Sequence, residues 1–358
     1  MMKYKIVTAF FLVVLGLYSC KSVNKNQAAS PRIRPLVDTV GFAHLPWQMD
    51  ALMTRFRETG WKENHAANPW KTVICPHDDY TYTGAIYPEL LENVKAATVL
   101  LIGVAHKAAQ LKIEDSLVFE TYGAWKGPWK NVRISAAREE IYRLLKGKYA
   151  MLSDTLQRVE HSLEALIPFL QYFNRNVEIV PVIVPAMSPE RMKECGKALA
   201  EALRNVVADH NWTWGKDFAI VATTDAVHYG NEDWGGSDRA RFGCDSEGNE
   251  KALMLEHEII DNCLKGDITP EKIRLFSSYT LDKDDYHVYK WTWCGRYSVP
   301  VALYTSYFLA TQGHLSGELV DYSTSITRFH VPVDDLRMGR TAIATPCHWV
   351  GYAALGYR

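Results

Sequence analysis

Residues 98–104 read Thr-Val-Leu-Leu-Ile-Gly-Val, an apolar run with no charged side chain. A short, continuous run of this kind predicts a strand that is covered on both faces, as strands of parallel sheets are. Residues 72–75 and 218–223 have the same character, and amphipathic helical patterns lie between these strands. The alternation predicts an α/β domain with a central mixed, mostly parallel sheet that is flanked by helices.

The remaining elements follow from the same patterns. Pro181 predicts that residues 177–184 form an edge or interrupted strand, because proline cannot donate a ladder hydrogen bond. The Gly-rich stretch 231–248, which contains Trp234, predicts a loop or lid. Two further strands are expected at 319–325 and 348–357. Helices are expected at 84–94, 135–145, 161–173, 251–264, 269–277 and 299–311, and another starts at Ser188-Pro189-Glu190.

The composition is that of an ordinary globular protein. The 358 residues are 47% hydrophobic and 23% charged, and the formal net charge is −1. Lys and Arg are scattered along the chain, so no basic field attracts nucleic acid. No internal repeat or interior linker is visible, and residues 46–358 are therefore predicted to form one domain without a nucleic-acid partner.

The N-terminal 45 residues have a different character. Residues 1–5 are positively charged, residues 6–17 are apolar, and Leu17-Tyr18-Ser19-Cys20 resembles the end of a bacterial lipoprotein signal. The apolar run is too short to span a membrane and fits a signal peptide, either a lipoprotein signal or a plain secretory one. We expect a signal at residues 1–20 with Cys20 lipidated, and a flexible tether at 21–45. The mature protein would sit outside the cytoplasm, touching a bacterial membrane through its lipid anchor only.

The other cysteines form no recognisable framework. Their spacing is wide and no C-x-x-C occurs, which argues against a stapled scaffold or a structural zinc knuckle. Most are predicted to be small buried hydrophobic residues. They are Cys75, Cys195, Cys244, Cys263, Cys294 and Cys347.

Polar clusters follow three of the apolar strands. His77-Asp78-Asp79-Tyr80 follows the first, His106 follows the second, and Asp225 and His228 follow the third. Ligands of open α/β sheets bind at the carboxyl ends of the strands, so these histidines converge if the strands are parallel neighbours. One such histidine alone is more often structural, but three together favour a metal site or acid/base chemistry. Asp225 and His228 would also suit an orienting acid and a proton-transferring base.

Two further clusters have both a functional and a structural interpretation. Glu160-His161-Ser162-Leu163-Glu164 places two carboxylates one turn apart on a helix face, where they either serve a site or complement the helix dipole. Cys294-Gly295-Arg296 precedes an apolar helix, a setting that lowers the pKa of a thiol, unless the cysteine is simply buried among aromatic residues. A zincin motif, a phosphate-binding P-loop, a dinucleotide fingerprint and a nucleophile elbow are all absent from the sequence.

Taken together, these clusters resemble the Memo family. Members are known from a bacterial three-gene grouping with a radical-SAM protein, as its system protein B, and from a eukaryotic cell-motility protein. The family segment Pro-His-Ala-Gly-Tyr-x-Tyr-x-Gly is similar to residues 76–84, and Gly-Pro-Ser-His is similar to 103–106. Glu-His-Ser-(Ile/Leu)-Glu is similar to 160–164, Ser-Ser-Asp-x-x-His-(Trp/Tyr)-Gly to 223–230, and Cys-Gly-Arg to 294–296. Order and rough spacing agree from about residue 70 onwards.

The resemblance implies a fold related to class III extradiol ring-cleaving dioxygenases, and a metal held by His77, His106 and Cys294. Iron or copper is the metal most strongly implied, with zinc as an alternative, because a thiolate is softer than the usual carboxylate ligand. Asp225 and His228 would act as catalytic residues beside the metal. The pocket would also include Asp78, Asp79, Tyr80, Glu160, His161, Glu164 and Arg296.

This chain departs from the family pattern beside its proposed ligands. Asp78 and Asp79 replace a small pair after the first histidine, and Val104-Ala105 replaces Pro-Ser before the second. The extra carboxylates either strengthen binding of a hard cation or fill the space of a substrate. Our leading hypothesis is a lipid-anchored, metal-dependent oxidase or dioxygenase-like enzyme for a small molecule, with a functional link to a radical-SAM protein.

Two alternatives remain open at this stage. One is a non-catalytic protein that binds a peptide or stores a metal, with Trp291 and Trp293 lining a recognition surface. The other is hydrolysis by a metal-activated water.

Overall fold

The apolar run at residues 98–104 forms a central strand of the sheet, β3 (Thr98–Val104). A computed structural model describes residues 31–64, 68–310 and 314–358, of which residues 32–358 form one compact unit. Parallel pairing joins β3 to β8 (Glu178–Val184) on one side and to β9 (Phe218–Thr223) on the other. On its far side, β9 pairs in parallel with β2 (Thr72–Cys75). The three strands that carry the histidine clusters are therefore adjacent and parallel, as predicted.

The sheet continues beyond this parallel centre with mixed pairing. Among the described residues it has thirteen strands, in the order β1-β5-β6-β8-β3-β9-β2-β13-β12-β11, with β10, β4 and β7 attached at its sides. The added strands are β1 Ile33–Arg34, β4 Leu117–Phe119, β5 Ala124–Trp125, β6 Val132–Ile134, β7 Ala150–Leu152, β10 His228–Gly230, β11 Gly266–Asp267, β12 Ser316–Thr324 and β13 His348–Tyr357.

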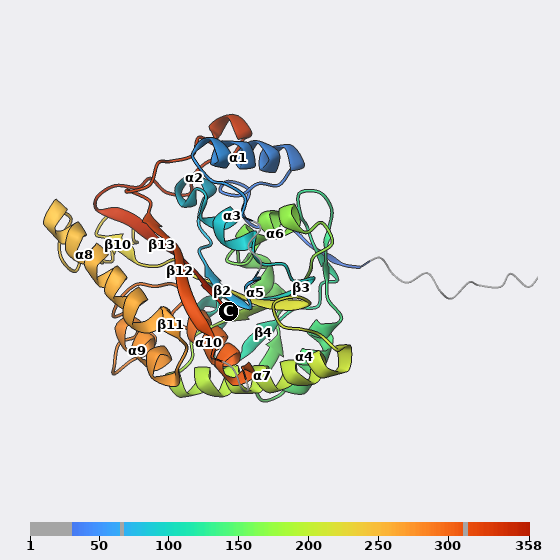
Figure 1. The fold of residues 1–358 in the computed structure, drawn as a ribbon. Coiled ribbons are helices and arrows are strands. Elements are labelled where there is room, and N and C mark those ends of the chain that lie inside the picture. Colours follow the sequence, from blue (N-terminus) through green and yellow to red (C-terminus); the bar gives the residue numbers. More distant parts are fainter. Residues whose placement is uncertain (1–30, 65–67, 311–313) are drawn as a thin grey trace, which may run out of the picture. The chain divides into compact units, whose positions relative to one another are not determined.

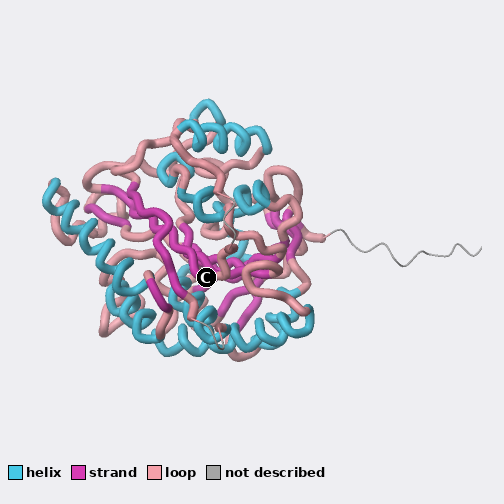
Figure 2. The backbone as a smooth tube through the Cα atoms, viewed as in Figure 1, coloured by secondary structure: helices cyan, strands magenta, loops and turns pink. Residues whose placement is uncertain are grey.

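Helices cover both faces of this sheet, which confirms the predicted α/β architecture (Figures 1 and 2). The longer helices are α1 Pro46–Glu58, α4 Ala137–Leu145, α7 Pro189–His210, α8 Ser246–Ile259, α9 Pro270–Thr280 and α10 Ser298–Leu309. Short ones are α2 Tyr80–Thr83, α3 Ile86–Leu91, α5 Asp154–Val159, α6 Ile167–Phe173, the 3-10 turns Ala109–Leu111, Glu164–Leu166 and Asp334–Leu336, and a π-turn at Ile260–Leu264. Within the described ranges, no helix combines the length and the apolarity needed to cross a bilayer.

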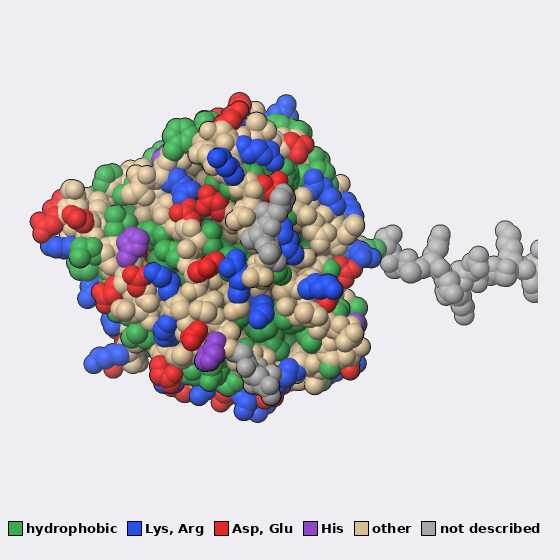
Figure 3. Space-filling view, in the orientation of Figure 1, with side chains coloured by type: hydrophobic (Ala, Val, Ile, Leu, Met, Phe, Trp, Pro, Cys, Tyr) green, Lys and Arg blue, Asp and Glu red, His purple; other side chains and the backbone are tan. Residues whose placement is uncertain are grey.

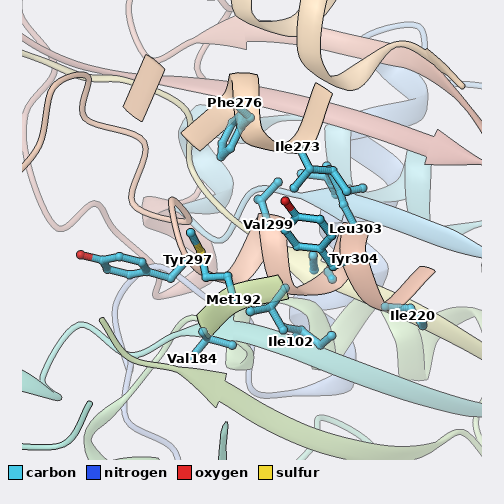
Figure 4. Packing of buried hydrophobic residues seen from close by; sticks show 14 of the residues in the cluster. Ile102, Val184, Met192, Ile220, Ile273, Phe276, Tyr297, Val299, Leu303 and Tyr304 are labelled. Atoms are coloured by element: carbon cyan, nitrogen blue, oxygen red, sulfur yellow. The ribbon is translucent and has the colours of Figure 1, made fainter. Parts of the chain in front are cut away.

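The strands send alternate side chains into two cores, because successive residues of a strand point to opposite faces. Leu100 and Ile102 pack with α7 and α10, whereas Val99 and Leu101 pack on the other face with α1, α3 and α6. Gly196 of α7 lets α10 approach, since a Cβ there would lie 2.5 Å from the Cβ of Tyr304. Figure 4 shows this packing, with labelled side chains that include Ile102, Val184, Met192, Val299, Leu303 and Tyr304.

Residues 177–184 were predicted to form an edge or interrupted strand; the edge position is wrong, whereas the pairing along one side of the strand is interrupted. Strand β8 lies inside the sheet, between β6 and β3. On the side away from β3, β6 pairs only with Glu178 and Ile179, and β4 pairs only with Ile183. By the two-residue period of a strand, the nitrogen of Pro181 faces the gap between β6 and β4. The proline therefore costs no ladder hydrogen bond.

Two predicted helices are shorter or broken. The helix expected at 84–94 is shortened to α3, and Gly84, at a φ of +58°, separates α3 from the preceding short helix α2. The helix expected at 161–173 begins later, as a 3-10 turn at Glu164–Leu166 and then α6. Pro168 lies in the first turn of α6, where its missing N–H has no helical partner to lose.

The ordered domain begins earlier than predicted. The tether was expected at residues 21–45, and its described part packs on the domain instead of forming a free linker. Strand β1 pairs with β5, and the buried guanidinium of Arg34 forms a 2.8 Å ion pair with Glu164. Arg34 also lies over the ring of Trp125 at 4.0 Å. The predicted signal peptide, with Cys20, and residues 21–30 lie outside the described residues.

Candidate metal centre

The site lies where β2, β9 and β3 end at the same edge of the sheet. Cys75 is level with Thr223 in the β2–β9 register, so His77 and Asp225 leave their strands at the same height. The backbone N–H of His77 donates a hydrogen bond of 2.9 Å to the Asp225 carboxylate. Parallel pairing of the strands thus brings the sequence-predicted residues together.

Three histidine rings meet at this edge. The ring centroids of His77 and His106 are 5.3 Å apart, and His161 stacks on His106 at 5.0 Å. Burial, together with the neighbouring His106, lowers the pKa of His161 to about 4, and burial is also the main cause that lowers the pKa of His77. Neutral imidazole is the form that binds metal ions. His161 was predicted to lie in the pocket, but it was not predicted to be a metal ligand.

Cys294 approaches the same histidine from the opposite side. Its Sγ lies 3.6 Å from Nε2 of His77 and accepts a 3.1 Å hydrogen bond from the backbone N–H of Asp225. Gly295 permits this approach, because a Cβ at that position would lie 2.3 Å from the Cβ of Thr224. Cys294 is therefore held by close backbone packing.

The expected lowering of the Cys294 pKa is wrong for the metal-free protein. Burial, and next the nearby Asp225 carboxylate, raise the pKa of this thiol well above its usual value. Helix α10 begins four residues later, and Arg296 stacks on the Tyr289 ring at 3.3 Å instead of facing the sulfur. A metal ion bound through this sulfur would have to displace its proton.

The donor atoms form two overlapping groups that share His77. His77, His106 and His161 make one group, and His77, Asp225 and Cys294 make the other, with the ligand atoms of each group within 4.8 Å of one another. In addition, Nδ1 of His77 is buried without a hydrogen-bond partner. Imidazole, carboxylate and thiolate donors at this spacing fit a transition metal ion. The resemblance implies a different set of ligands, namely His77, His106 and Cys294, and neither group contains all three. This particular set stays a prediction.

Asp225 and His228 are neighbours but do not form a hydrogen bond. Oδ2 of Asp225 lies 4.0 Å from Nε2 of His228 and only 3.4 Å from Nε2 of His77. Burial raises the pKa of Asp225 to about 7, and burial together with Arg239 lowers that of His228 to about 3. Among the described residues, Nε2 of His228 has no hydrogen-bond partner. His228 is thus a neutral imidazole that lines the pocket, and the role of Asp225 as its orienting group stays a prediction.

A cavity of about 500 Å³ opens above these residues, within the usual size range of small-molecule pockets. Asp78, Asp79 and His161 line it, as the sequence analysis expected. The two aspartates leave this space open because their carboxylates are engaged, Asp78 by the Tyr352 hydroxyl at 2.6 Å and Asp79 by Thr341. Burial raises the pKa of both carboxyls.

Several lining residues were missed by sequence reasoning. Val37 to Val40 and Phe42 come from the segment expected to be a tether, and Trp234 comes from the predicted lid. The region from Asn231 to Cys244 is indeed irregular, whereas helix α8 starts at Ser246. No periodicity marks such residues, because they reach the cavity only through tertiary packing. The other unpredicted lining residues are Thr341, Ala342, His348 and Val350.

Four predicted pocket residues do not line this cavity. The Tyr80 side chain lies in the core, and its hydroxyl donates to the carbonyl of Ala165 at 2.6 Å. Glu164 pairs with Arg34, and Arg296 donates to the carbonyl of His287. Glu160, the fourth, supports His106 from behind, at 3.1 Å from its Nδ1. The two glutamates were expected on one helix face, but residues 160–163 form a bend and turn between α5 and the 3-10 turn, which sends them to different partners.

Replacing Glu160 with Gln should weaken metal binding about ten- to a hundredfold while leaving the fold intact. The carboxylate fixes the orientation of the His106 ring and also accepts the backbone N–H of Lys107 at 2.5 Å. Titration of the apo protein with a divalent metal in competition with a chelator measures the effect. Glu139→Gln, at an exposed carboxylate of α4, is the matched control and should bind metal normally. Equal affinities for both variants would contradict the supporting role of Glu160.

Comparison with known proteins agrees with these motifs. A sequence profile of the family described as "Memo-like protein" matches residues 43–332, more than half of the chain. A MEMO1 family protein of Methanothermobacter thermautotrophicus is 33% identical over 168 residues, which cover 46% of this chain and 56% of the relative. MEMO1 family proteins of Methanosarcina mazei and Aquifex aeolicus are 27% and 30% identical, covering 57% and 44% of this chain and 65% and 54% of their own lengths.

These matches therefore span between about half and two-thirds of the relatives. The profile match covers the segments that carry His77, His106, Glu160, Asp225 and Cys294. By its profile and by its relatives, the chain belongs to the Memo-like protein family.

Proposed function

We propose that this chain binds a redox-active metal ion at the His77 site and oxidises a small organic substrate in the cavity above it. The observation that carries the proposal is the pair of donor groups sharing His77 at the base of a cavity of about 500 Å³. Iron or copper suits the mixture of imidazole and sulfur donors best, and zinc is the redox-inactive alternative. When bound, such a metal supplies Lewis acidity and electron transfer.

The chain's own residues would bind the substrate and move its proton. His228 lines the cavity with a ring nitrogen that has no partner among the described residues, and its lowered pKa keeps the ring neutral, so that it can accept a hydrogen bond from a substrate hydroxyl and take its proton once that hydroxyl is acidified by the metal. Phe42, Trp234 and Val350 provide apolar contacts for a flat or aliphatic substrate. Among the described residues, the lining contains no Lys or Arg, so neutral or cationic substrates are favoured over anionic ones.

In the peptide-binding alternative, Trp291 and Trp293 were expected to line a recognition surface. Trp291 and Trp293 are both buried, and their indole N–H groups donate to Glu256 at 2.6 and 2.7 Å. They therefore cannot form a recognition surface. Storage of a metal without catalysis and hydrolysis by a metal-activated water are the remaining rivals, and activity measurements separate both from an oxidase.

The N-terminal residues of the chain suggest where the mature protein is located. We infer from residues 1–20 that the mature protein is attached by acyl chains at Cys20 to the outer side of a bacterial membrane. Mass spectrometry of the protein from a membrane fraction would detect the lipidated cysteine. A water-soluble mature chain without acyl groups would contradict this placement.

The metallated protein should consume oxygen when supplied with catechols or other small reductants. Purified apo protein is loaded with iron(II) or copper under controlled oxygen, the metal content is measured, and oxygen uptake is followed with an electrode. The His228→Gln variant should keep its metal and lose most of the uptake, because it lacks the proton-accepting nitrogen. A fully loaded protein that consumes no oxygen with any reductant would favour metal storage.

A further inference from the structure

Cys244 and Cys347 lie together next to the cavity-lining residue His348, although they are far apart in the sequence. Both side chains are partly exposed, unlike those of Cys75, Cys195, Cys263 and Cys294. Their thiols interact with each other, and this contact is the main cause that raises the pKa of Cys347 to about 11. The prediction that most of these cysteines are buried is confirmed, since the other four described cysteines are buried and this pair is the exception.

The backbone around the pair is tightly held. Gly230 pairs with His348 in the β10–β13 ladder, and a Cβ on Gly230 would lie 1.7 Å from the carbonyl oxygen of Cys347. The N–H of Glu232 donates to the same carbonyl at 3.1 Å. Cys244 also lies close to this part of the backbone, since its Sγ lies 3.6 Å from the side-chain oxygen of Asn231. Residues 231–244 therefore form a loop that starts and ends beside Cys347, which we call the rim loop.

The rim loop contributes Trp234 to the lining of the cavity. Trp234, which belongs to it, stacks on His348 with the ring centroids 4.0 Å apart and lies 5.2 Å from the ring of His228. His348 directly follows Cys347 and also lines the cavity. A covalent bond between the two cysteines would thus join the loop that carries Trp234 to the strand that carries its stacking partner.

We propose that Cys244 and Cys347 form a reversible disulfide that fixes the rim loop over the cavity. The two thiols lose two electrons and two protons to an external disulfide, which leaves as two thiols, and one S–S bond forms between the cysteines. One thiolate of the pair attacks the external disulfide to form a mixed disulfide, and the second thiol of the pair then displaces the remaining external thiol. This inference does not depend on the metal or on the proposed oxidation reaction.

The thiols of Cys244 and Cys347 are both accessible to solvent and in contact with each other, which distinguishes this pair from the other described cysteines. Exchange requires thiols that an external disulfide can reach, and only these two of the described cysteines are partly exposed. Cys294 lies against His77 and Asp225, which keeps it apart from the exchange. A compartment outside the cytoplasm, as proposed for this chain, would also favour the oxidised form.

The test uses the full chain treated with oxidised or with reduced glutathione. Mass spectrometry of the oxidised sample should show a Cys244–Cys347 cross-linked peptide, while the reduced sample should show both residues alkylated. The Cys263→Ser control, at a buried thiol, should form the same cross-link. Cys244 and Cys347 both fully alkylated after oxidation, or cross-linked to other cysteines, would overturn the proposal.

A second measurement reports on the rim loop itself. Trypsin can cleave after Arg239 and Arg241 within the loop, and cleavage there should be about tenfold slower in the oxidised protein, because local opening must precede it. Cleavage after the exposed Lys283, in another loop, provides the internal control. In Cys244→Ser and Cys347→Ser, oxidation should leave both rates unchanged. Equal cleavage of the oxidised and reduced wild type at Arg239 would show that the bond does not fix the loop.

Discussion

Replacing His77 with alanine should abolish metal binding, with a loss of affinity greater than about a hundredfold. His77 is the one residue shared by both donor groups, so its removal leaves two donors in each. The other donors belong to different segments of the chain, and within each group they lie within 4.8 Å of a ligand atom of His77. Metal content after loading and dialysis, measured by plasma mass spectrometry, gives the result directly.

A matched control separates ligand loss from loss of structure. His314→Ala removes an exposed imidazole far from the donor groups and should bind metal as the wild type does. Because His77 is buried, its removal also leaves a small cavity, so thermal unfolding of the apo proteins is compared first. A folded His77→Ala protein with unchanged metal content would show that the candidate centre is wrong.

Two further variants distinguish the donor groups from each other. A metal held by the three histidines would be weakened by His106→Ala and not by Cys294→Ser, and a metal held by Asp225 and Cys294 would show the opposite result. The ligand set implied by the family resemblance, His77 with His106 and Cys294, requires both variants to weaken binding. We expect this last outcome, because the resemblance implies these three ligands and each of them belongs to at least one of the two donor groups.

The sequence was sufficient to predict the centre of the sheet and the meeting of its polar ends. Fully apolar runs such as residues 98–104 occur where both faces of a strand are covered, and parallel neighbours place their carboxyl ends together. His77, His106 and Asp225 could therefore be placed in one site before their contacts were known. Pro181 misled the prediction because its effect depends on which neighbours the strand has, and these are set by the whole fold.

The walls of the cavity could not be predicted in the same way. Val37 and Phe42 belong to a segment whose composition resembles a linker, yet Arg34 anchors that segment through a buried ion pair with Glu164. The pairing joins residues 130 positions apart, and neither residue alone signals it. Similarly, nothing in the spacing of Cys244 and Cys347 indicates that β10 and β13 bring them together.

Glu256 is the clearest case of a residue that sequence reasoning passed over. It lies in α8, is fully buried, and accepts hydrogen bonds from the indoles of Trp291 and Trp293. Its second oxygen accepts the backbone N–H of Val227 at 3.1 Å and the hydroxyl of Tyr322 at 3.3 Å. A single carboxylate therefore joins the segment before His228 to the segment before Cys294. Its position in an ordinary helical pattern carries no sign of this role.

Replacing Glu256 with alanine should lower the free energy of unfolding by about 3 to 5 kcal/mol. The substitution leaves two indole N–H groups and one backbone N–H buried without acceptors, and each such group costs about 1 to 3 kcal/mol. Glu256→Gln should cost less, about 2 kcal/mol, because its carbonyl still accepts one pair of donors while its NH2 group faces the other. Urea unfolding followed by circular dichroism measures both values.

The effect of Glu256 on metal affinity should be measurable separately from its effect on stability. Trp293 precedes Cys294 directly and pairs with Val227 across an isolated bridge, so the loss of Glu256 releases both segments together. Under conditions where the Gln variant is fully folded, its metal affinity should fall about tenfold, as for other residues that orient ligands. The Glu250→Ala variant, at an exposed position on the same helix, should match the wild type in both measurements. If Glu256→Gln lost stability and kept wild-type metal affinity, the carboxylate would serve the core alone, and Cys294 would be positioned by Gly295 and Thr224 without it.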